Sequence, residues 1–197
     1  MSNQDSFIDE VTEEVRRDKL YGLMRRYGWI AILLVVLVVG GAAANEWRKS
    51  AARAEAEAAG EAILAAVSEG TAEERAEALA ALPPAEGGDR RALEGLLRAA
   101  AEAEAGDDEA ARSTLEAIAG DPETPANYRD LALLKAVMLS GASDPEERIA
   151  KLQSLMEPGN PYRLLAIEQR AFAEVEMGQP ETAIQPLTDI LADADLT

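Results

Sequence analysis

Carboxylates are the most numerous side chains in this sequence that could catalyse a reaction or bind a metal. The sequence has 37 Asp and Glu residues but no Cys and no His. Adjacent carboxylates suit a hard cation such as Ca²⁺. These clusters, however, lack the alternating oxygen ligands and the Gly of an EF-hand loop. We therefore predict no metal site and expect the clusters to cap helices and to supply acids in their first turns. They are Asp107 to Glu109, Asp121 to Glu123 and Asp144 to Glu147.

The sequence offers no catalytic constellation. Pairs such as Glu102 and Glu104 are two residues apart and point away from one another on a helix, so we expect solvated faces rather than an acid/base pair. Ser113 and Thr114 have no base within reach by sequence. Without His or Cys the chain also lacks imidazole, thiolate and the nitrogen or sulfur ligands of zinc, copper, haem iron and iron–sulfur clusters. We predict no cofactor and no enzymatic activity.

The elements that must carry the function are helices. Only 4% of the residues are aromatic, and Ala, Glu, Leu and Arg are frequent, which is typical of an all-α protein. Charge is unevenly distributed: residues 1–49 carry seven basic and seven acidic residues, so the net charge of -18 lies entirely in residues 50–197. Such a surface repels phosphate, which argues against nucleic-acid binding.

The strongest feature is the uncharged stretch from Tyr27 to Asn45. As a helix it extends roughly 28 Å, close to the hydrocarbon thickness of a lipid bilayer. We predict a transmembrane helix over residues 27–46. The residues expected to anchor it in the membrane are Tyr27, Trp29, Leu33, Leu37 and Trp47.

Two alternatives to a membrane span stay open. The first is a buried core helix, although nothing else in the chain is apolar enough to surround it. The second is a cleaved signal peptide, because Ala42 to Ala44 resembles a signal-peptidase site. The late start of the apolar stretch, behind an acidic segment, argues against cleavage.

The flanks of the span predict its orientation. Five Lys and Arg residues lie within a dozen residues before it, against three just after it, so the positive-inside rule places the N-terminus in the cytoplasm. Residues 1–26 would form a cytoplasmic amphipathic arm, which either docks on a partner or on the inner leaflet, or is solvated without a partner. Residues 47–197 would form a domain across the membrane, periplasmic in a Gram-negative bacterium. No Pro interrupts residues 46–69, so we expect the membrane helix to continue into that domain.

Glycines recur in this domain at a nearly constant period. Gly70, Gly106, Gly141 and Gly178 each end an apolar-periodic stretch, at spacings of 36, 35 and 37 residues. A helix of about 15 residues is expected before each Gly, and one of about 11 after it. Gly suits the left-handed position that ends a helix. The pattern predicts tandem helical hairpins, as in an α-solenoid.

Two of these units resemble tetratricopeptide repeats. Small residues lie five positions after Gly106 and Gly178, and seven positions before them, where two helices would cross closely. The units around Gly70 and Gly141 depart from this spacing, and the aromatic residues usual in the consensus are largely missing. The expected inter-helix small residues are Ala99, Ala111, Ala171 and Ala183.

The whole layout resembles the YfgM-type family, ancillary subunits of the bacterial SecYEG translocon. The resemblance implies a single-pass inner-membrane scaffold whose periplasmic repeats contact the Sec translocon, periplasmic chaperones or exported proteins. A second interpretation is an accessory subunit of another inner-membrane complex, such as a respiratory supercomplex.

Under the first interpretation, the first helices of the hairpins line a binding groove. These helices are expected over residues 89–105, 126–140 and 161–177. The core or groove residues, with core the safer assignment for most, are Tyr128, Leu131, Leu134, Val137, Tyr162 and Phe172.

The last expected helix carries an apolar stripe formed by Ile184, Leu187 and Leu191. No polar capping helix follows it. Either a further C-terminal segment covers the stripe, or the stripe is a partner surface.

Overall fold

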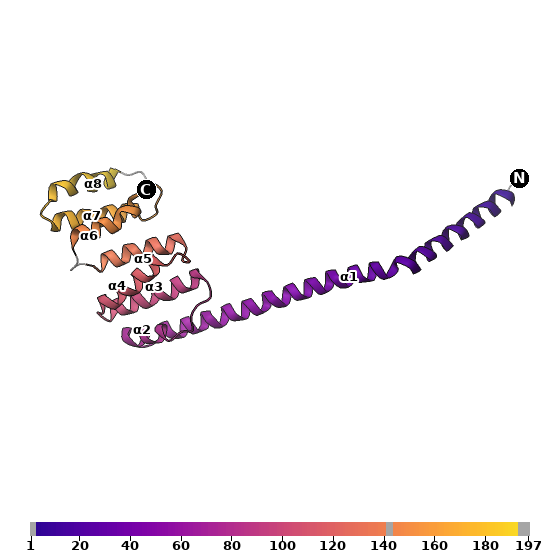
Figure 1. Ribbon diagram of the computed structural model, residues 1–197, viewed down its shortest axis with the longest axis horizontal. Helices are drawn as coiled ribbons and strands as arrows, with labels where there is room; N and C mark the ends of the chain where they lie inside the picture. The colour runs from indigo at the N-terminus through magenta and orange to yellow at the C-terminus, as the bar shows by residue number, and fades with distance from the viewer. Residues whose placement is uncertain (1–2, 141–143, 193–197) are drawn as a thin grey trace. The chain divides into compact units, whose positions relative to one another are not determined.

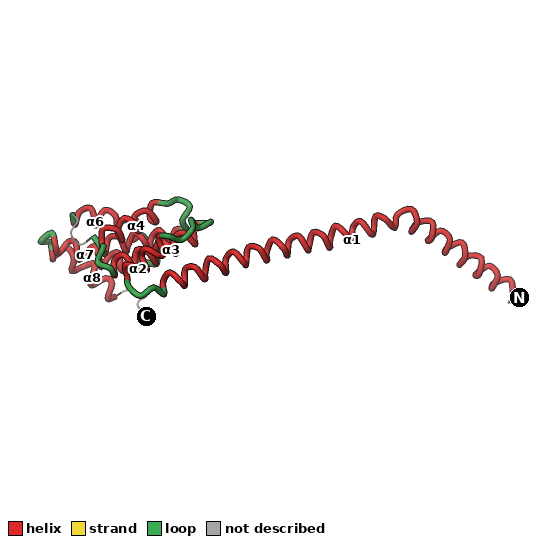
Figure 2. Tube along the Cα trace, turned by 90° about the horizontal axis from the view of Figure 1, so that it is seen from below, coloured by secondary structure: helices red, strands yellow, loops and turns green. Residues whose placement is uncertain are grey.

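The computed structural model describes residues 3–140 and 144–192, which form helices and loops and contain no strand (Figure 1). The predicted all-α fold is therefore confirmed. Figure 2 shows the loops that join the helices of residues 59–192. The helices are α1 (Asn3–Val67), α2 (Ala72–Ala80), α3 (Gly88–Glu104), α4 (Asp108–Gly120), α5 (Ala126–Met138), α6 (Pro145–Leu152), the short 3₁₀ helix η1 (Gln153–Met156), α7 (Arg163–Glu176) and α8 (Pro180–Ala192).

The chain divides into two compact units, Met1–Ala58 and Ala59–Thr197, so the boundary falls inside α1. In the first unit, α1 contains a segment long and apolar enough to cross a membrane, and none of that segment is buried. A buried core helix, one of the two alternatives, is therefore not what the structure shows. The amphipathic pattern expected for the arm falls mostly on residues 1–20, whose side chains lie outside the described part of the structure.

Local side chains explain where several helices begin. Thr71 accepts a hydrogen bond from the Glu74 amide while the Glu74 carboxylate accepts one from the Thr71 amide, which forms a capping box for α2. Asp107 caps α4 by accepting a hydrogen bond from the Ala110 amide, and Asp144 caps α6 through the Glu146 amide. The capping role predicted for these two acidic clusters is confirmed.

The third cluster behaves differently. Asp121 follows α4 directly, and its carboxylate accepts hydrogen bonds from the Glu123 amide at 2.9 Å and the Thr124 hydroxyl at 3.1 Å. It therefore stabilises the loop between α4 and α5. Pro125, not an acid, occupies the N-cap of α5. The prediction of a helix cap here is wrong because the loop is longer than the acidic cluster.

In the second unit, each helix packs on the next along the sequence, and α3 also contacts α5 while α5 contacts α7. Figure 1 shows this order as a stack from α2 to α8. Its core is made largely of alanines, which let helices approach closely. The buried residues that share the central cluster are Ala92, Ala99, Ala111, Leu115, Ile118, Ala132 and Ala136.

The glycines expected between paired helices differ in conformation. Gly106 and Gly178 have positive φ angles of 83° and 75° and follow α3 and α7. Gly70 also lies between two helices but is not in the left-handed region. A side chain supplies a hydrogen bond to a backbone carbonyl at the end of α1, because the Ser68 hydroxyl donates to the Leu64 carbonyl at 2.6 Å. Gly141 lies outside the described residues.

The hairpin formed by α5 and α6 departs from the expected helix lengths. Its second helix, α6, has eight residues and continues into η1, where Leu155 is completely buried. The 3₁₀ turn tightens the end of the helix and brings Leu155 into a cluster with Leu134, Leu152 and Ala166.

Candidate functional site

The small residues expected between paired helices are all buried. Ala99 of α3 and Ala111 of α4 belong to the central cluster, and Ala171 of α7 and Ala183 of α8 are buried to the same degree. A larger side chain at any of these positions would force the two helices of a pair apart.

Two close approaches were not apparent from the sequence. A Cβ atom on Gly95 would lie 2.7 Å from Ile118 Cδ1, so Gly95 lets α4 pack against α3. A Cβ atom on Gly88 would lie 2.0 Å from the Glu123 carbonyl oxygen. Each partner is more than twenty residues away in sequence, and no local pattern marks such positions.

A groove lies between α3 and α5, the first helices of two consecutive hairpins. The helix bounds differ by only one or two residues from those expected for the helices that line the groove. The pocket at its centre has a volume of about 150 Å³. Its lining is apolar except for Lys135, and consists of Leu96, Ala99, Ala100, Ala103, Leu115, Lys135, Met138 and Leu139.

The exposure of the lining decides what the groove could bind. Met138 and Ala100 are exposed, so their apolar surface is available to a ligand. Lys135 is also exposed and stands on α5, one turn before Leu139. Apolar anchors beside a single cation suit a protein segment with a large apolar side chain and a nearby carboxylate.

None of the six residues expected in the core or groove lines this pocket, and they differ in burial. Leu134 and Val137 are buried, whereas Tyr128, Leu131 and Tyr162 are half-buried. Phe172 on α7 is the exception, because 49% of its surface is exposed.

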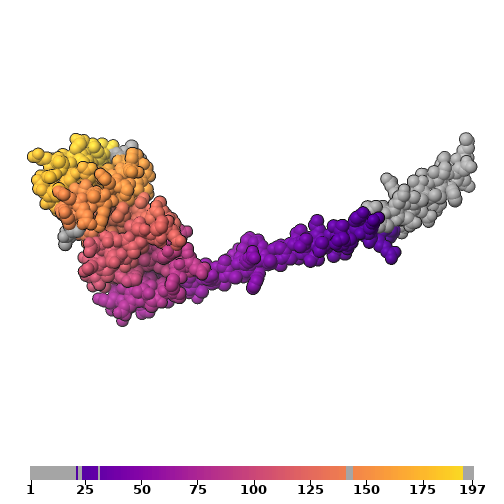
Figure 3. All heavy atoms as spheres, in the orientation of Figure 1, coloured from indigo at the N-terminus to yellow at the C-terminus, as the bar shows by residue number. Residues whose placement is uncertain are grey.

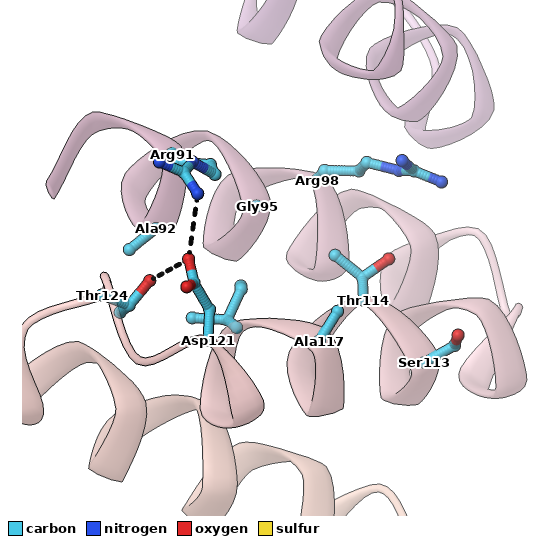
Figure 4. A pocket seen from close by; sticks show the side chains of 10 residues that line it. Arg91, Ala92, Gly95, Arg98, Ser113, Thr114, Ala117, Asp121 and Thr124 are labelled. Atoms are coloured by element: carbon cyan, nitrogen blue, oxygen red, sulfur yellow. Dashed lines mark hydrogen bonds and ion pairs between the residues drawn. The ribbon is translucent and has the colours of Figure 1, made fainter. Parts of the chain in front are cut away.

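A second pocket, of about 380 Å³, lies between α3 and α4 (Figure 4). Arg91 and Arg98 of α3 lie on one side of it, and Ser113, Thr114 and Asp121 on the other. Both arginines are already paired with carboxylates, because Arg91 contacts Asp121 and Glu123 at 3.1 Å each, and Arg98 contacts Glu102. The pocket therefore has no net positive charge to offer an anion.

Asp121 is the residue at this pocket with a shifted pKa. The hydrogen bond from the Glu123 amide lowers the pKa of its carboxyl below the usual 3.8, and the Thr124 hydroxyl and Arg91 act in the same direction. Figure 4 shows Arg91 and Thr124 converging on this carboxylate. The group thus remains ionised and ties α3 to the loop after α4.

Glu102 corrects one prediction. It was expected on a solvated face, but it is buried, and it accepts hydrogen bonds from Arg98 Nε at 2.6 Å and from the Thr114 hydroxyl at 2.8 Å. Thr114 thus has a carboxylate within reach, which the sequence did not indicate because the two residues lie on different helices. Arg98 and Thr114 each donate to a different oxygen of this carboxylate, so the contact is suited to structure rather than to activating a nucleophile.

Glu174 on α7 repeats this arrangement only in part. Arg170 Nε donates to Glu174 Oε1 at 2.8 Å, as Arg98 does to Glu102. Glu174 Oε2 is buried and has no hydrogen-bond partner among the described residues. Thr114 lies eight residues after Gly106. The residue eight positions after Gly178, on α8, is Pro186, which has no hydroxyl.

The five anchor residues expected in the membrane lie along α1. Tyr27, Trp29, Leu33, Leu37 and Trp47 are all exposed on that helix. Within the described parts of the chain, no three carboxylates gather in an arrangement that could hold a metal ion.

Comparisons with protein-family models, with curated proteins and with solved structures found no match to this chain.

Proposed function

We propose that this protein is a membrane-anchored scaffold that binds other proteins through a periplasmic array of helical hairpins, and that it is not an enzyme. The observation that carries this proposal is the combination of an unburied apolar helical segment with an apolar groove in the second unit. Each part of the proposal has its own support.

The transmembrane assignment of residues 27–46 rests on the physics of exposed apolar surface. Ten successive residues from Ile30 to Val39 without a polar side chain cannot remain in water on a single helix without a large free-energy cost. A bilayer removes that cost and leaves the backbone hydrogen bonds of the helix intact. The larger number of Lys and Arg residues before the span than just after it, five against three, supports a cytoplasmic N-terminus and an inner-membrane location.

The tetratricopeptide-like assignment rests on the packing of the second unit. Successive helices contact one another in sequence order, and among the first helices of the hairpins α3 contacts α5 and α5 contacts α7. Gly106 and Gly178 in the left-handed region, and buried alanines at fixed distances from them, support a repeated hairpin.

The partner proposed is the Sec translocon, with periplasmic chaperones or exported proteins as further partners of the groove. This follows the resemblance of the whole layout to the YfgM-type family. The groove between α3 and α5 supports a role in binding protein segments, because its apolar lining includes the exposed Met138 and Ala100.

The test is affinity purification of the full chain in mild detergent, followed by mass spectrometry. The comparison is with a double variant, Ala100→Asp and Met138→Asp, which places charges in the groove at exposed positions. Leu64→Asp is the control, since Leu64 is exposed and lies outside the groove. We expect SecY, SecE or periplasmic chaperones with the wild-type chain and the control, and a clear loss of at least one of them with the groove variant.

Recovery of stoichiometric respiratory subunits instead, unchanged in the groove variant, would contradict the translocon proposal. That result would support the second interpretation, an accessory subunit held by its span and arm. Deleting residues 1–46 would then abolish the association.

A further inference from the structure

The hairpin of α7 and α8 repeats that of α3 and α4 at an offset of 72 residues. Both hairpins have a left-handed Gly in the turn, two buried alanines in the helix crossing, and a buried Glu paired with an Arg four residues earlier. The equivalent residues are Arg98 and Arg170, Ala99 and Ala171, Glu102 and Glu174, Gly106 and Gly178, and Ala111 and Ala183.

The first of these hairpins shows what its outer face binds. α5 packs against α4 and also contacts α3. Leu115 and Ile118 are only 2% and 8% exposed in the cluster that α5 joins, and Ala103 and Ala119 pack against this cluster. Ile118 also packs against Gly95 of α3. Ala132 and Ala136 of α5 enter the same cluster. The face is therefore a docking surface for one amphipathic helix.

The second hairpin has the same face, and no described helix covers it. The residues equivalent to Ala103, Leu115, Ile118 and Ala119 are Val175, Leu187, Ile190 and Leu191, all apolar. Val175 is 50% exposed and Leu191 is 82% exposed, while Leu187 and Ile190 are half-buried. In Figure 3 the yellow atoms of α8 lie at the opposite end of the second unit from α2. We call Val175, Leu187, Ile190 and Leu191 the end face.

Charge selects among possible occupants of the end face. The segment 163–192, which makes up α7, α8 and the turn between them, has five carboxylates but only two arginines. Glu174 is paired with Arg170 and Glu176 with Arg148 of α6, and an excess of carboxylates remains, with Glu181 and Asp189 on α8 itself. A second copy of this chain would bring the same excess of negative charge to the contact. A helix with basic residues beside its apolar stripe would instead be attracted.

We propose that the end face binds an amphipathic helix of another protein, with a small-residue apolar stripe like that of α5 and with basic flanks. The equivalence of the two hairpins supplies the geometry, and the acidic surroundings supply the preference for a basic partner. This proposal stands on helix packing and charge in the second unit, and it needs neither the membrane placement nor the groove.

The test uses a defined probe. A fluorescent, helix-stabilised peptide with the sequence of residues 125–140 carries the stripe that already covers α3 and α4, and Asp130→Lys in the peptide makes its flank more basic. It is titrated against the full chain in detergent at two salt concentrations. A control peptide also carries Ala132→Asp, which places a charge in the stripe.

Variants of the full chain locate the contact. Leu191→Asp changes an exposed residue of the end face. Leu165→Asp changes an exposed apolar residue of α7 outside the face, because its equivalent in the first hairpin, Leu93, stays exposed beside α5. We expect saturable binding that weakens with added salt, falls by at least roughly tenfold with Leu191→Asp, and is unchanged with Leu165→Asp. Circular dichroism should show the same helix content in all three chains.

Three results would overturn the proposal. They are no saturable binding of the basic peptide, equal binding of the control peptide, and equal losses in the two protein variants. Sedimentation of the full chain adds a fourth: a dimer that Leu191→Asp dissociates would make a second copy the occupant of the end face.

Discussion

At the scale of single residues, the hydroxyl of Thr114 is the clearest case of a side chain whose role depends on a buried partner. It donates to Glu102 Oε2, while Arg98 donates to the other oxygen. We expect Thr114→Val to lower the free energy of unfolding by about 1–3 kcal/mol, because it leaves a buried carboxylate oxygen without a donor. Chemical denaturation measures this change.

Ser113 provides the matched control for Thr114. It lines the same pocket but is exposed, so Ser113→Ala should change the free energy of unfolding by no more than about 0.5 kcal/mol. Equal effects of the two substitutions would show that the hydrogen bond to Glu102 contributes nothing specific.

Gly88 tests the close approach between α3 and the loop after α4. The Cβ atom of Gly88→Ala would clash with the Glu123 carbonyl, so we expect destabilisation by about 1–3 kcal/mol despite the better helix propensity of Ala. Gly60→Ala on α1 meets nothing within 4 Å and should instead stabilise by about 0.5–1 kcal/mol. Thermal unfolding measures both changes, and we expect Tm to fall for Gly88→Ala and to rise for Gly60→Ala. A Tm change of the same sign in both variants would refute the predicted clash.

The lowered pKa of Asp121 predicts that the stability of the fold depends on pH. Its folded-state pKa is lowered, chiefly by the Glu123 amide, so its contribution to stability is complete above the usual value of 3.8 and is lost as the pH falls through the folded-state pKa. Asp121→Asn should therefore lower Tm at neutral pH, and its Tm should approach that of the wild type below pH 3.8. Glu86→Gln, at an exposed site, is the control. A Tm difference for Asp121→Asn that stays constant down to pH 2 would contradict this account.

At the scale of elements, the proposed membrane span in α1 makes a testable prediction. Leu33→Arg together with Leu37→Arg should strongly reduce membrane integration, since each Arg near the centre of a span costs about 2.5–3.5 kcal/mol. Leu64→Arg on the same helix should integrate as the wild type does, because Leu64 lies outside the apolar stretch. Carbonate extraction of membranes measures the integrated fraction, and full integration of the double variant would count against a span at residues 27–46.

Sequence alone predicted those parts of the elements that depend on neighbours in the chain. The all-α fold, the caps at Asp107 and Asp144 and the bounds of the groove helices follow from local composition, capping chemistry and periodicity. Features that join distant segments were missed. Burial of Glu102 needs Thr114 on the next helix, and the close approach at Gly88 needs the Glu123 carbonyl. The conformation of Gly70 also differed, because Ser68 satisfies the end of α1.

At the scale of the whole molecule, the distribution of charge and apolar surface supports one arrangement. Basic and acidic residues nearly balance before the apolar stretch, and almost all of the excess negative charge follows it. Under the proposed topology, the acidic hairpins are kept away from the anionic inner leaflet of the cytoplasmic membrane. They also present a surface whose charged partners would be basic.

The most direct test of this account is to locate the segments before and after the proposed span relative to the membrane. The sequence has no Cys, so a single introduced Cys is a unique label. Ser113→Cys marks an exposed position in the hairpin unit, and Ser6→Cys marks the N-terminal arm. Intact spheroplasts are treated with a membrane-impermeant maleimide, and a second sample is treated after permeabilisation. The account predicts labelling of Cys at position 113 in intact spheroplasts and of Cys at position 6 only after permeabilisation, and the reverse pattern, or labelling of both in intact spheroplasts, would contradict it.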